Sequence, residues 1–344
     1  MIAKLNWPIF VRIPTVDQRS SVVHSEQYEE VPRLASCCGD LITMPPTRDL
    51  EQHIDCSPTT PIVRTVELPE RGNLLVWECV GPPGAPAVLL LHGVTMTAEL
   101  CWSPVIQRLG KTYHVVAPDL RGHGDGIPCG SRFSLEDCAD DVAALAAALN
   151  LDRVIVVGYS MGGMVAQLLW RRHRKLVAGL VLCATSRNVR GSPLEKIMSL
   201  TMPAIMSTMR WNPAAHAFTS QVLGESLLGH IKDPDTRAWV RRQLNRTSLS
   251  NSLSAVQAVS RFTSHEWIGE LDVPAAVVIT MQDRLVPASR QHRLAAAVAH
   301  AEVIEVAADH GICVSAPGKF GTTIANACAL VAPSPDDRRR PAHP

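Results

Sequence analysis

One serine of the chain stands in a setting that could make its hydroxyl a nucleophile. Ser160 is the centre of the hexapeptide Gly-Tyr-Ser-Met-Gly-Gly, residues 158–163, which follows the apolar run Val154–Val157 and precedes a helical pattern. A strand that turns this tightly into a helix strains its central residue and leaves room only for glycine two residues to either side. The turn lifts the hydroxyl clear of the sheet, at a helix start whose dipole favours negative charge. We therefore predict that Ser160 is a nucleophile.

Such a serine needs a base, and thirteen histidines compete for that role. His310 lies in a loop just after the last predicted strand, Glu302–Val306, and therefore at the same edge of the sheet as Ser160. His114 begins a strand and lies at the opposite edge. Other histidines lie in helical or surface stretches: His173, His216, His230, His265, His292 and His300. We therefore predict that His310 is the base.

The base needs a carboxylate that holds its ring in one orientation and stabilises the imidazolium. Asp283 follows the predicted strand Ala275–Thr280, again at this edge. The stretch after the preceding strand, Thr185–Arg190, contains no Asp or Glu, which excludes the alternative position for the acid. Asp309 is adjacent to His310 in sequence and poorly placed to fold back onto it, so it fits a loop-stabilising role. Asp283 is the predicted acid.

A second loop could hold the negative charge that forms on a reacting carbonyl. Residues 91–94, Leu-His-Gly-Val, follow the apolar strand Ala87–Leu91. The backbone N–H of Val94 would lie beside that of Met161, and losing one such donor typically raises the barrier by ~3 to 4 kcal/mol. We predict that these two amides form an oxyanion hole. His92 is better explained by local hydrogen bonds that shape the loop than as a base.

The elements that must position these loops alternate along the chain. Wholly apolar strands separated by helices indicate an α/β fold with a mostly parallel, doubly wound sheet and right-handed crossovers. The carboxyl ends of such strands meet at one edge, which brings the four loops together. We predict strands at residues 63–68, 74–80, 87–91, 114–117, 154–157, 178–184, 275–280 and 302–306, and helices at 98–109, 134–149, 161–172, 289–298 and 318–330.

The alternation stops between residues 187 and 267, which we predict to be a helical insertion into a core of residues 61–186 and 268–332. Residues 1–60 lack periodicity and carry turn-prone clusters, which predicts an irregular or poorly ordered extension. Residues 333–344 are predicted to be a disordered tail. Prolines separate four helix-like stretches within the insertion, at residues 194–209, 214–228, 235–247 and 252–262.

The composition of the chain excludes some classes of binding partner. With 33 basic and 32 acidic residues the net charge is +1, which provides no basic surface for nucleic acid. No stretch approaches the ~18 apolar residues of a membrane span or the ~7–15 of a signal peptide. Ten scattered cysteines without paired spacing favour free thiols in a reducing cytosol. We expect a cytoplasmic protein that needs no metal or cofactor; the sequence leaves its oligomeric state open.

These motifs give the chain a resemblance to the α/β-hydrolase superfamily, in its capped AB hydrolase-1 type, over roughly residues 62–332. The resemblance implies that the insertion forms a cap over the pocket, and that Asp119, Arg121 and His123 brace the loop near the active site. The extension before residue 60 and the lone His-Gly of the oxyanion loop depart from other members. The matching segments are residues 92–93 with Trp102 further along, 118–124, 158–163, 283–287 and 309–311.

The fold and the three residues Ser160, His310 and Asp283 do not determine which of the activities of this superfamily the chain has. A serine nucleophile excludes haloalkane dehalogenases, which need a carboxylate, and acyl transfer to water through an acyl-serine is the default. Methionines at helical spacing in the insertion suit a pocket for varied acyl chains, although packing between helices is the commoner cause of such a stripe. We predict hydrolysis of a carboxylic ester with a medium or lipid-like acyl group. The predicted pocket residues are Trp102, Tyr159, Met198, Met202 and Met206.

Two other classes stay open. One is a hydrolase or lyase of carbon–carbon bonds, such as the enzymes of menaquinone synthesis that share the Gly-Tyr-Ser-Met-Gly-Gly segment. Those enzymes bind polycarboxylates, so Arg187, Arg190 and Arg210 turned into the pocket would favour that class. The other is a non-catalytic ligand receptor, which a fluorophosphonate would not label at Ser160.

Overall fold

The computed structural model describes residues 60–130, 132–189, 231 and 233–333. The predicted helices at 194–209 and 214–228 lie outside the described residues. So do residues 1–59 of the predicted extension and 334–344 of the predicted tail.

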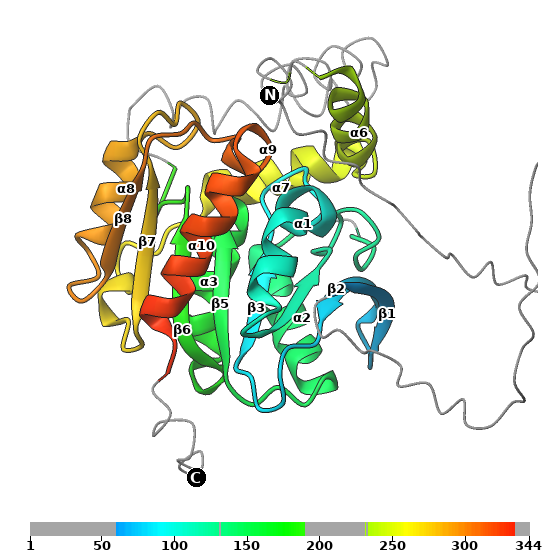
Figure 1. Cartoon of the computed structure of the whole chain (residues 1–344), viewed down its shortest axis with the longest axis horizontal. Coiled ribbons are helices and arrows are strands. Elements are labelled where there is room, and N and C mark those ends of the chain that lie inside the picture. The colour runs from blue at the N-terminus through cyan, green and yellow to red at the C-terminus, as the bar shows by residue number, and fades with distance from the viewer. Residues whose placement is uncertain (1–59, 131, 190–230, 232, 334–344) are drawn as a thin grey trace, which may run out of the picture. The chain divides into compact units, whose positions relative to one another are not determined.

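Eight strands form one sheet in the order β1-β2-β4-β3-β5-β6-β7-β8. The strands β3 to β8 run parallel, whereas β2 is antiparallel to both of its neighbours, β1 and β4. The predicted mostly parallel α/β fold is therefore confirmed (Figure 1). The bounds are β1 Ile62–Leu68, β2 Gly72–Cys79, β3 Ala87–Leu91, β4 His114–Pro118, β5 Val154–Tyr159, β6 Val177–Cys183, β7 Ala275–Thr280 and β8 Glu302–Val306.

The helices between the strands begin and end close to the predicted residues. The short helix α9, which follows the loop of His310, has too few residues for a periodic pattern and was not predicted. The bounds are α1 Ala98–Leu109, α2 Leu135–Ala148, α3 Met161–Arg172, α6 Pro234–Leu244, α7 Leu249–Arg261, α8 Ala288–Ala295, α9 Ile312–Ser315 and α10 Pro317–Val331, with single 3₁₀ turns at Arg174–Leu176 and Ile268–Glu270.

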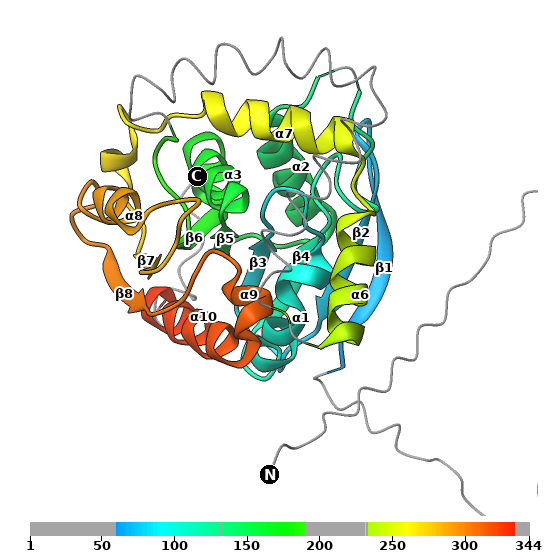
Figure 2. The ribbon, with the colours of Figure 1, turned by 90° about the horizontal axis from the view of Figure 1, so that it is seen from above.

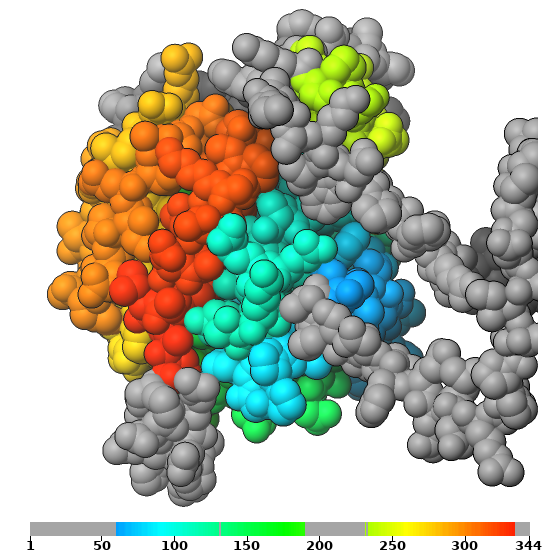
Figure 3. Space-filling view, viewed as in Figure 1, coloured from blue at the N-terminus to red at the C-terminus, as the bar shows by residue number. Residues whose placement is uncertain are grey.

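Helices cover both faces of the sheet because successive side chains of a strand point to opposite faces. In β3, Val88 and Leu90 are buried against α1 and α10, whereas Leu89 and Leu91 are buried against α2 and α3. Figure 2 shows α1, α9 and α10 on one side of the sheet and α2, α3 and α8 on the other. Figure 3 shows α1 and α10 side by side on the surface of the first layer. The two cores explain why the central strands are wholly apolar.

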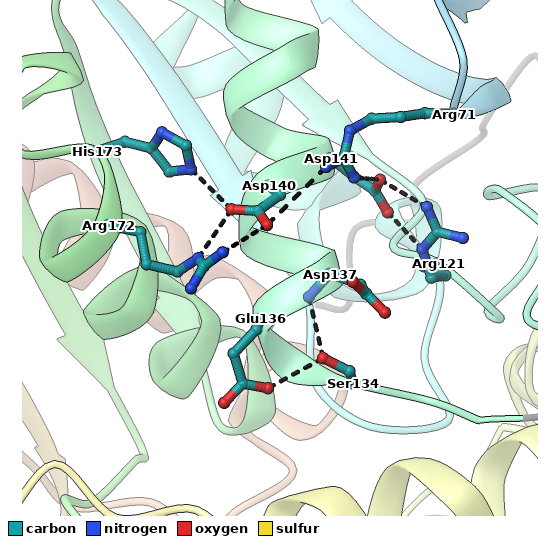
Figure 4. A network of polar contacts seen from close by, with 9 residues as sticks. All are labelled: Arg71, Arg121, Ser134, Glu136, Asp137, Asp140, Asp141, Arg172 and His173. Carbon is teal, nitrogen blue, oxygen red and sulfur yellow. Dashed lines mark hydrogen bonds and ion pairs between the residues drawn. The ribbon is translucent and has the colours of Figure 1, made fainter.

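Two adjacent carboxylates tie α2 to its neighbours (Figure 4). Asp141 accepts two hydrogen bonds of 2.7 Å from Arg121 and a third of 2.6 Å from Arg71, which lies in the β1–β2 turn. Asp140 accepts from Arg172 at 2.8 and 2.7 Å and contacts His173 at 2.8 Å. A planar guanidinium matches a carboxylate in this paired geometry. Arg121 thereby anchors the loop that follows β4.

The helices α6 and α7 occupy residues 234–261 of the predicted insertion and contact the core at several points. The hydroxyl of Thr97 donates to Gln243 at 2.9 Å, and the amide of Asn251 donates to the carbonyl oxygen of Gly122 at 3.0 Å. Arg246 pairs with Asp125. That this insertion covers a substrate stays a prediction. Among the described helices, none combines the length and apolar character needed to cross a membrane.

Candidate active site

Four loops meet at the carboxyl edge of the parallel strands. Ser160 directly follows β5, Asp283 follows β7, His310 follows β8, and Gly93 lies in the loop after β3. Parallel strands deliver their carboxyl ends to one edge, where the ligands of open α/β sheets bind. The arrangement therefore gathers residues that lie far apart in the sequence.

A chain of hydrogen bonds joins three of these residues. The Nδ1 atom of His310 lies 2.7 Å from Oδ2 of Asp283, and its Nε2 atom lies 3.0 Å from Oγ of Ser160. A carboxylate only accepts hydrogen bonds, so Nδ1 carries the proton and Nε2 can accept the hydroxyl hydrogen of Ser160. The side chain of Asp283 has no exposed area, and that of His310 is 13% exposed. The geometry allows the imidazole to remove the proton of Ser160.

The turn that carries Ser160 is strained, as the glycine spacing predicted. Ser160 has φ 54° and ψ −115°, a backbone conformation that residues other than glycine rarely adopt. A Cβ atom on Gly162 would lie 2.0 Å from the carbonyl oxygen of Leu91, and one on Gly158 would lie 2.4 Å from that of Gly162. Both contacts involve backbone atoms, which cannot rotate away. The two glycines are therefore a steric requirement.

Hydrogen bonds hold the strained peptide in place. The N–H of Ser160 donates to the carbonyl oxygen of Cys183 at 2.9 Å, and its own carbonyl oxygen accepts from the hydroxyl of Thr185 at 2.8 Å. A Cβ atom on Gly163 would lie 2.5 Å from the methyl group of Thr185. Thr185 thus supports the turn from the end of β6. No local pattern of the sequence marks this role, because the hydrogen bond joins residues that are 25 positions apart.

The loop after β3 lies directly against the nucleophile. A Cβ atom on Gly93 would lie 3.2 Å from Sδ of Met96, 3.3 Å from the ring of Tyr159 and 3.4 Å from Cβ of Ser160, so a side chain here would crowd its neighbours. Met161 is the first residue of α3, where a backbone N–H has no partner within the helix. Val94, the other predicted donor, is the next residue of the loop and half-buried. Their convergence as an oxyanion hole stays a prediction.

His92 shapes this loop through two local hydrogen bonds. Its Nε2 atom accepts from the N–H of Leu120 at 2.9 Å, so Nδ1 carries the proton and donates to the carbonyl oxygen of Gly93 at 2.8 Å. Complete burial lowers the pKa of His92 from 6.5 to about 4, because burial disfavours the charged ring. His92 is a neutral connector between the loops that follow β3 and β4.

The loop after β4 is held by Asp119 and His123. Asp119 accepts from the N–H groups of Ala98 at 2.7 Å and Asp125 at 2.9 Å, and burial raises the pKa of its carboxyl group. His123 donates from Nδ1 to the carbonyl oxygen of Arg121 at 3.0 Å, and burial lowers its pKa to about 3. These contacts fit the bracing roles that the sequence resemblance implied.

Two of the predicted pocket residues belong to the hydrophobic core. Trp102 is completely buried, with its ring stacked on Phe320 at 5.4 Å between centroids, and the structure does not support a place for it in a pocket wall. Tyr159 is 1% exposed and packs against the ring of His310 at 5.5 Å. Its ring therefore contacts the base from within the core. Met198, Met202 and Met206 lie outside the described residues, as do Arg190 and Arg210.

Most of the chain matches one known protein family. A family model described as the alpha/beta hydrolase fold matches residues 86–317, more than half of the chain. The chain belongs to this family. The matched range contains Ser160, Asp283 and His310, each of which follows a parallel strand.

Two curated relatives are less than 30% identical to this chain. An uncharacterized protein of Mycobacterium tuberculosis is 27% identical over 194 residues, which cover 53% of this chain and 54% of that protein. The chain thus spans about half the length of this relative. A pimeloyl-(acyl-carrier protein) methyl ester esterase of Neisseria meningitidis is 29% identical over 213 residues, covering 60% of this chain and 78% of the esterase.

Solved structures share the fold. A thermophilic esterase from Thermogutta terrifontis superposes with a TM-score of 0.66 over 79% of this chain and 100% of the esterase, at 21% identity. At this identity the likeness concerns the fold and not the substrate.

Proposed function

We propose that the protein is a serine hydrolase that cleaves a carboxylic ester through an acyl-serine intermediate. The observation that carries the proposal is the relay in which His310 lies 3.0 Å from Ser160 Oγ and 2.7 Å from Asp283 Oδ2. Such a relay activates a hydroxyl that is otherwise a weak nucleophile.

Each residue has a defined step. Nε2 of His310 takes the proton as Oγ of Ser160 attacks the ester carbonyl, and Asp283 stabilises the resulting imidazolium. The N–H groups of Val94 and Met161 hold the oxyanion. The imidazolium then protonates the departing alcohol, which leaves the acyl-serine. A water molecule, deprotonated by His310, attacks the acyl-serine and releases the acid.

An ester is proposed as the substrate from the comparison with a curated relative. The name of the Neisseria meningitidis relative is that of an esterase of a methyl ester, and this chain covers 78% of its length. The acyl group is proposed to be medium-length or lipid-like. The methionines behind that part of the proposal lie outside the described residues.

A panel of p-nitrophenyl esters of increasing chain length tests the proposal, together with fluorophosphonate labelling. The full chain should hydrolyse at least one ester and take up one label. Ser160→Ala should lower kcat by at least ~10⁴-fold, because the nucleophile is lost. Ser289→Ala, at an exposed position of α8, is the matched control and should behave like the parent chain.

The outcomes separate the candidate classes. Labelling that survives in Ser160→Ala would overturn the assignment of the nucleophile. Labelling at Ser160 without hydrolysis of any ester would favour another bond, such as a carbon–carbon bond. The absence of labelling would favour a non-catalytic ligand receptor.

A further inference from the structure

The carboxylate of Asp283 accepts hydrogen bonds at both of its oxygens. Oδ1 accepts from the backbone N–H groups of Leu285 at 2.9 Å and Val286 at 2.8 Å. A buried charge needs such donors in place of water. These two contacts fix one oxygen of the group and leave Oδ2 to face His310.

Oδ2 has two further neighbours that sequence reasoning did not identify. The hydroxyl of Thr280 donates to it at 2.8 Å, and the side-chain amide of Gln291 approaches it at 3.2 Å. Thr280 is the last residue of β7, and Gln291 lies on α8. Both are completely buried. The atom that bonds to His310 is therefore held from the β7–α8 segment itself.

The orientation of the Gln291 amide is fixed by its other contacts. Its Oε1 atom accepts from the N–H of Thr280 at 3.0 Å. Its Nε2 atom donates to Oγ1 of Thr280 at 2.8 Å and to the carbonyl oxygen of Val286 at 2.7 Å. A flipped amide would place its NH₂ group against the Thr280 N–H, so only this orientation gives each of these donors an acceptor.

This orientation determines what Thr280 can do. A hydroxyl has a single hydrogen to donate. Because the carboxylate of Asp283 only accepts, the hydrogen of the Thr280 hydroxyl is directed to Oδ2, while Oγ1 accepts from Gln291. The hydrogen bond from Gln291 thereby helps to hold the hydroxyl in the orientation that donates to the carboxylate.

We propose that Thr280 and Gln291 are positioning residues that hold Oδ2 of Asp283 on Nδ1 of His310. The inference rests on the proposed function, because it assigns these residues to the same relay. The hydrogen bonds that the carboxylate accepts from Thr280, Leu285 and Val286, and its longer contact with Gln291, all come from residues 280–291.

Conservative variants provide the test. Thr280→Val removes the hydroxyl and keeps the shape of the side chain, whereas Thr280→Ser keeps the hydroxyl; Gln291→Met removes the amide. With the concentration of active Ser160 measured by fluorophosphonate titration, Thr280→Val and Gln291→Met should lower kcat roughly ten- to a hundredfold, as small displacements of catalytic groups do. KM should change less than about threefold, because neither side chain reaches the substrate, and Thr280→Ser should restore kcat to within about threefold of the parent chain.

A second readout needs no substrate. The proton between His310 and Asp283 should give a far-downfield NMR resonance, identified by its loss in His310→Ala. That resonance should shift in Thr280→Val and in Gln291→Met and stay in place in the surface control Ser289→Ala.

The outcomes distinguish this inference from the proposed function. An active parent chain whose Thr280→Val and Gln291→Met variants keep both kcat and the resonance would overturn the inference. A parent chain that hydrolyses no ester would refute the proposed function, whereas a shift of the resonance would still support the positioning role. If Gln291→Met does not fold, the pair Thr280→Val and Thr280→Ser decides.

Discussion

At the residue scale, the site depends on a few close contacts around one strained residue. Ser160 adopts a backbone conformation that costs on the order of 1–3 kcal/mol and persists only where its surroundings enforce it. Those surroundings are the carbonyl oxygen of Cys183 and the hydroxyl of Thr185, which form hydrogen bonds to Ser160, and Gly162, which has no side chain to collide with the loop after β3. The nucleophile is thus held by contacts that leave its hydroxyl free to meet His310.

Gly162→Ala should lower the free energy of unfolding by roughly 3 kcal/mol or more, since the new methyl group would lie 2.0 Å from a carbonyl oxygen and force the backbone to shift. Urea unfolding followed by circular dichroism measures the change. Gly318→Ala is the control, because nothing lies within 4 Å of the added atom and α10 gains a better helix former. Equal unfolding midpoints for the two variants would contradict the steric explanation.

At the element scale, α2 connects the antiparallel edge of the sheet with the loop after β4. Asp141 joins both, through Arg71 from the β1–β2 turn and Arg121 from the loop (Figure 4). The carboxylate is 5% exposed, so the two guanidinium groups replace the water that it would otherwise bind. Loss of its charge should therefore affect more than the helix itself.

We expect Asp141→Asn to lower the free energy of unfolding by about 2 kcal/mol, because it removes the charge that both guanidinium groups share. Glu136→Gln, five residues earlier on the exposed face of α2, should change it by less than about 0.5 kcal/mol. Denaturant unfolding of both variants measures the difference. An effect of Asp141→Asn no larger than that of Glu136→Gln would show that the paired contacts contribute little.

At the scale of the whole molecule, buried neutral histidines should make the fold sensitive to acid. Burial lowers the pKa of His92 to about 4 and that of His123 to about 3. In the unfolded chain each ring would titrate near 6.5. Between these values the unfolded state binds more protons, so the free energy of unfolding rises with pH in this range and falls as the solution is acidified.

The stability contributed by the neutral His92 ring should be complete above pH 6.5 and lost as the pH falls to about 4. His92→Asn keeps a donor for the carbonyl oxygen of Gly93 and has no titratable group. Its free energy of unfolding should therefore depend less steeply on pH in this window than that of the parent chain. Urea unfolding across the window measures both slopes, and parallel slopes would refute the contribution of His92.

The sequence alone predicted the elements and the loops that matter. Wholly apolar runs and helical periodicity depend on local chemistry, so β3, β7, β8, α1 and α3 begin and end at the predicted residues. The glycines around Ser160 meet the steric requirement of a single turn. Because a turn is a local structure, the sequence could predict it. The position of His310 and Asp283 after their strands followed from the rule that parallel strands end at one edge.

Tertiary structure alone decided how the side chains pair. Trp102 is a large aromatic residue and was predicted to line a pocket. It lies in the core against Phe320 instead, because α1 and α10 pack together on one face of the sheet. Gln291 interrupts the apolar face of α8, which is a signal that the sequence does contain. Its contact with Asp283, however, forms only when the β7–α8 segment folds back. Sequence thus determined which backbone positions reach the site, since local pattern encodes strands, turns and their ends. Which side chains hold the relay depended on contacts across loops and helices, which no local pattern records.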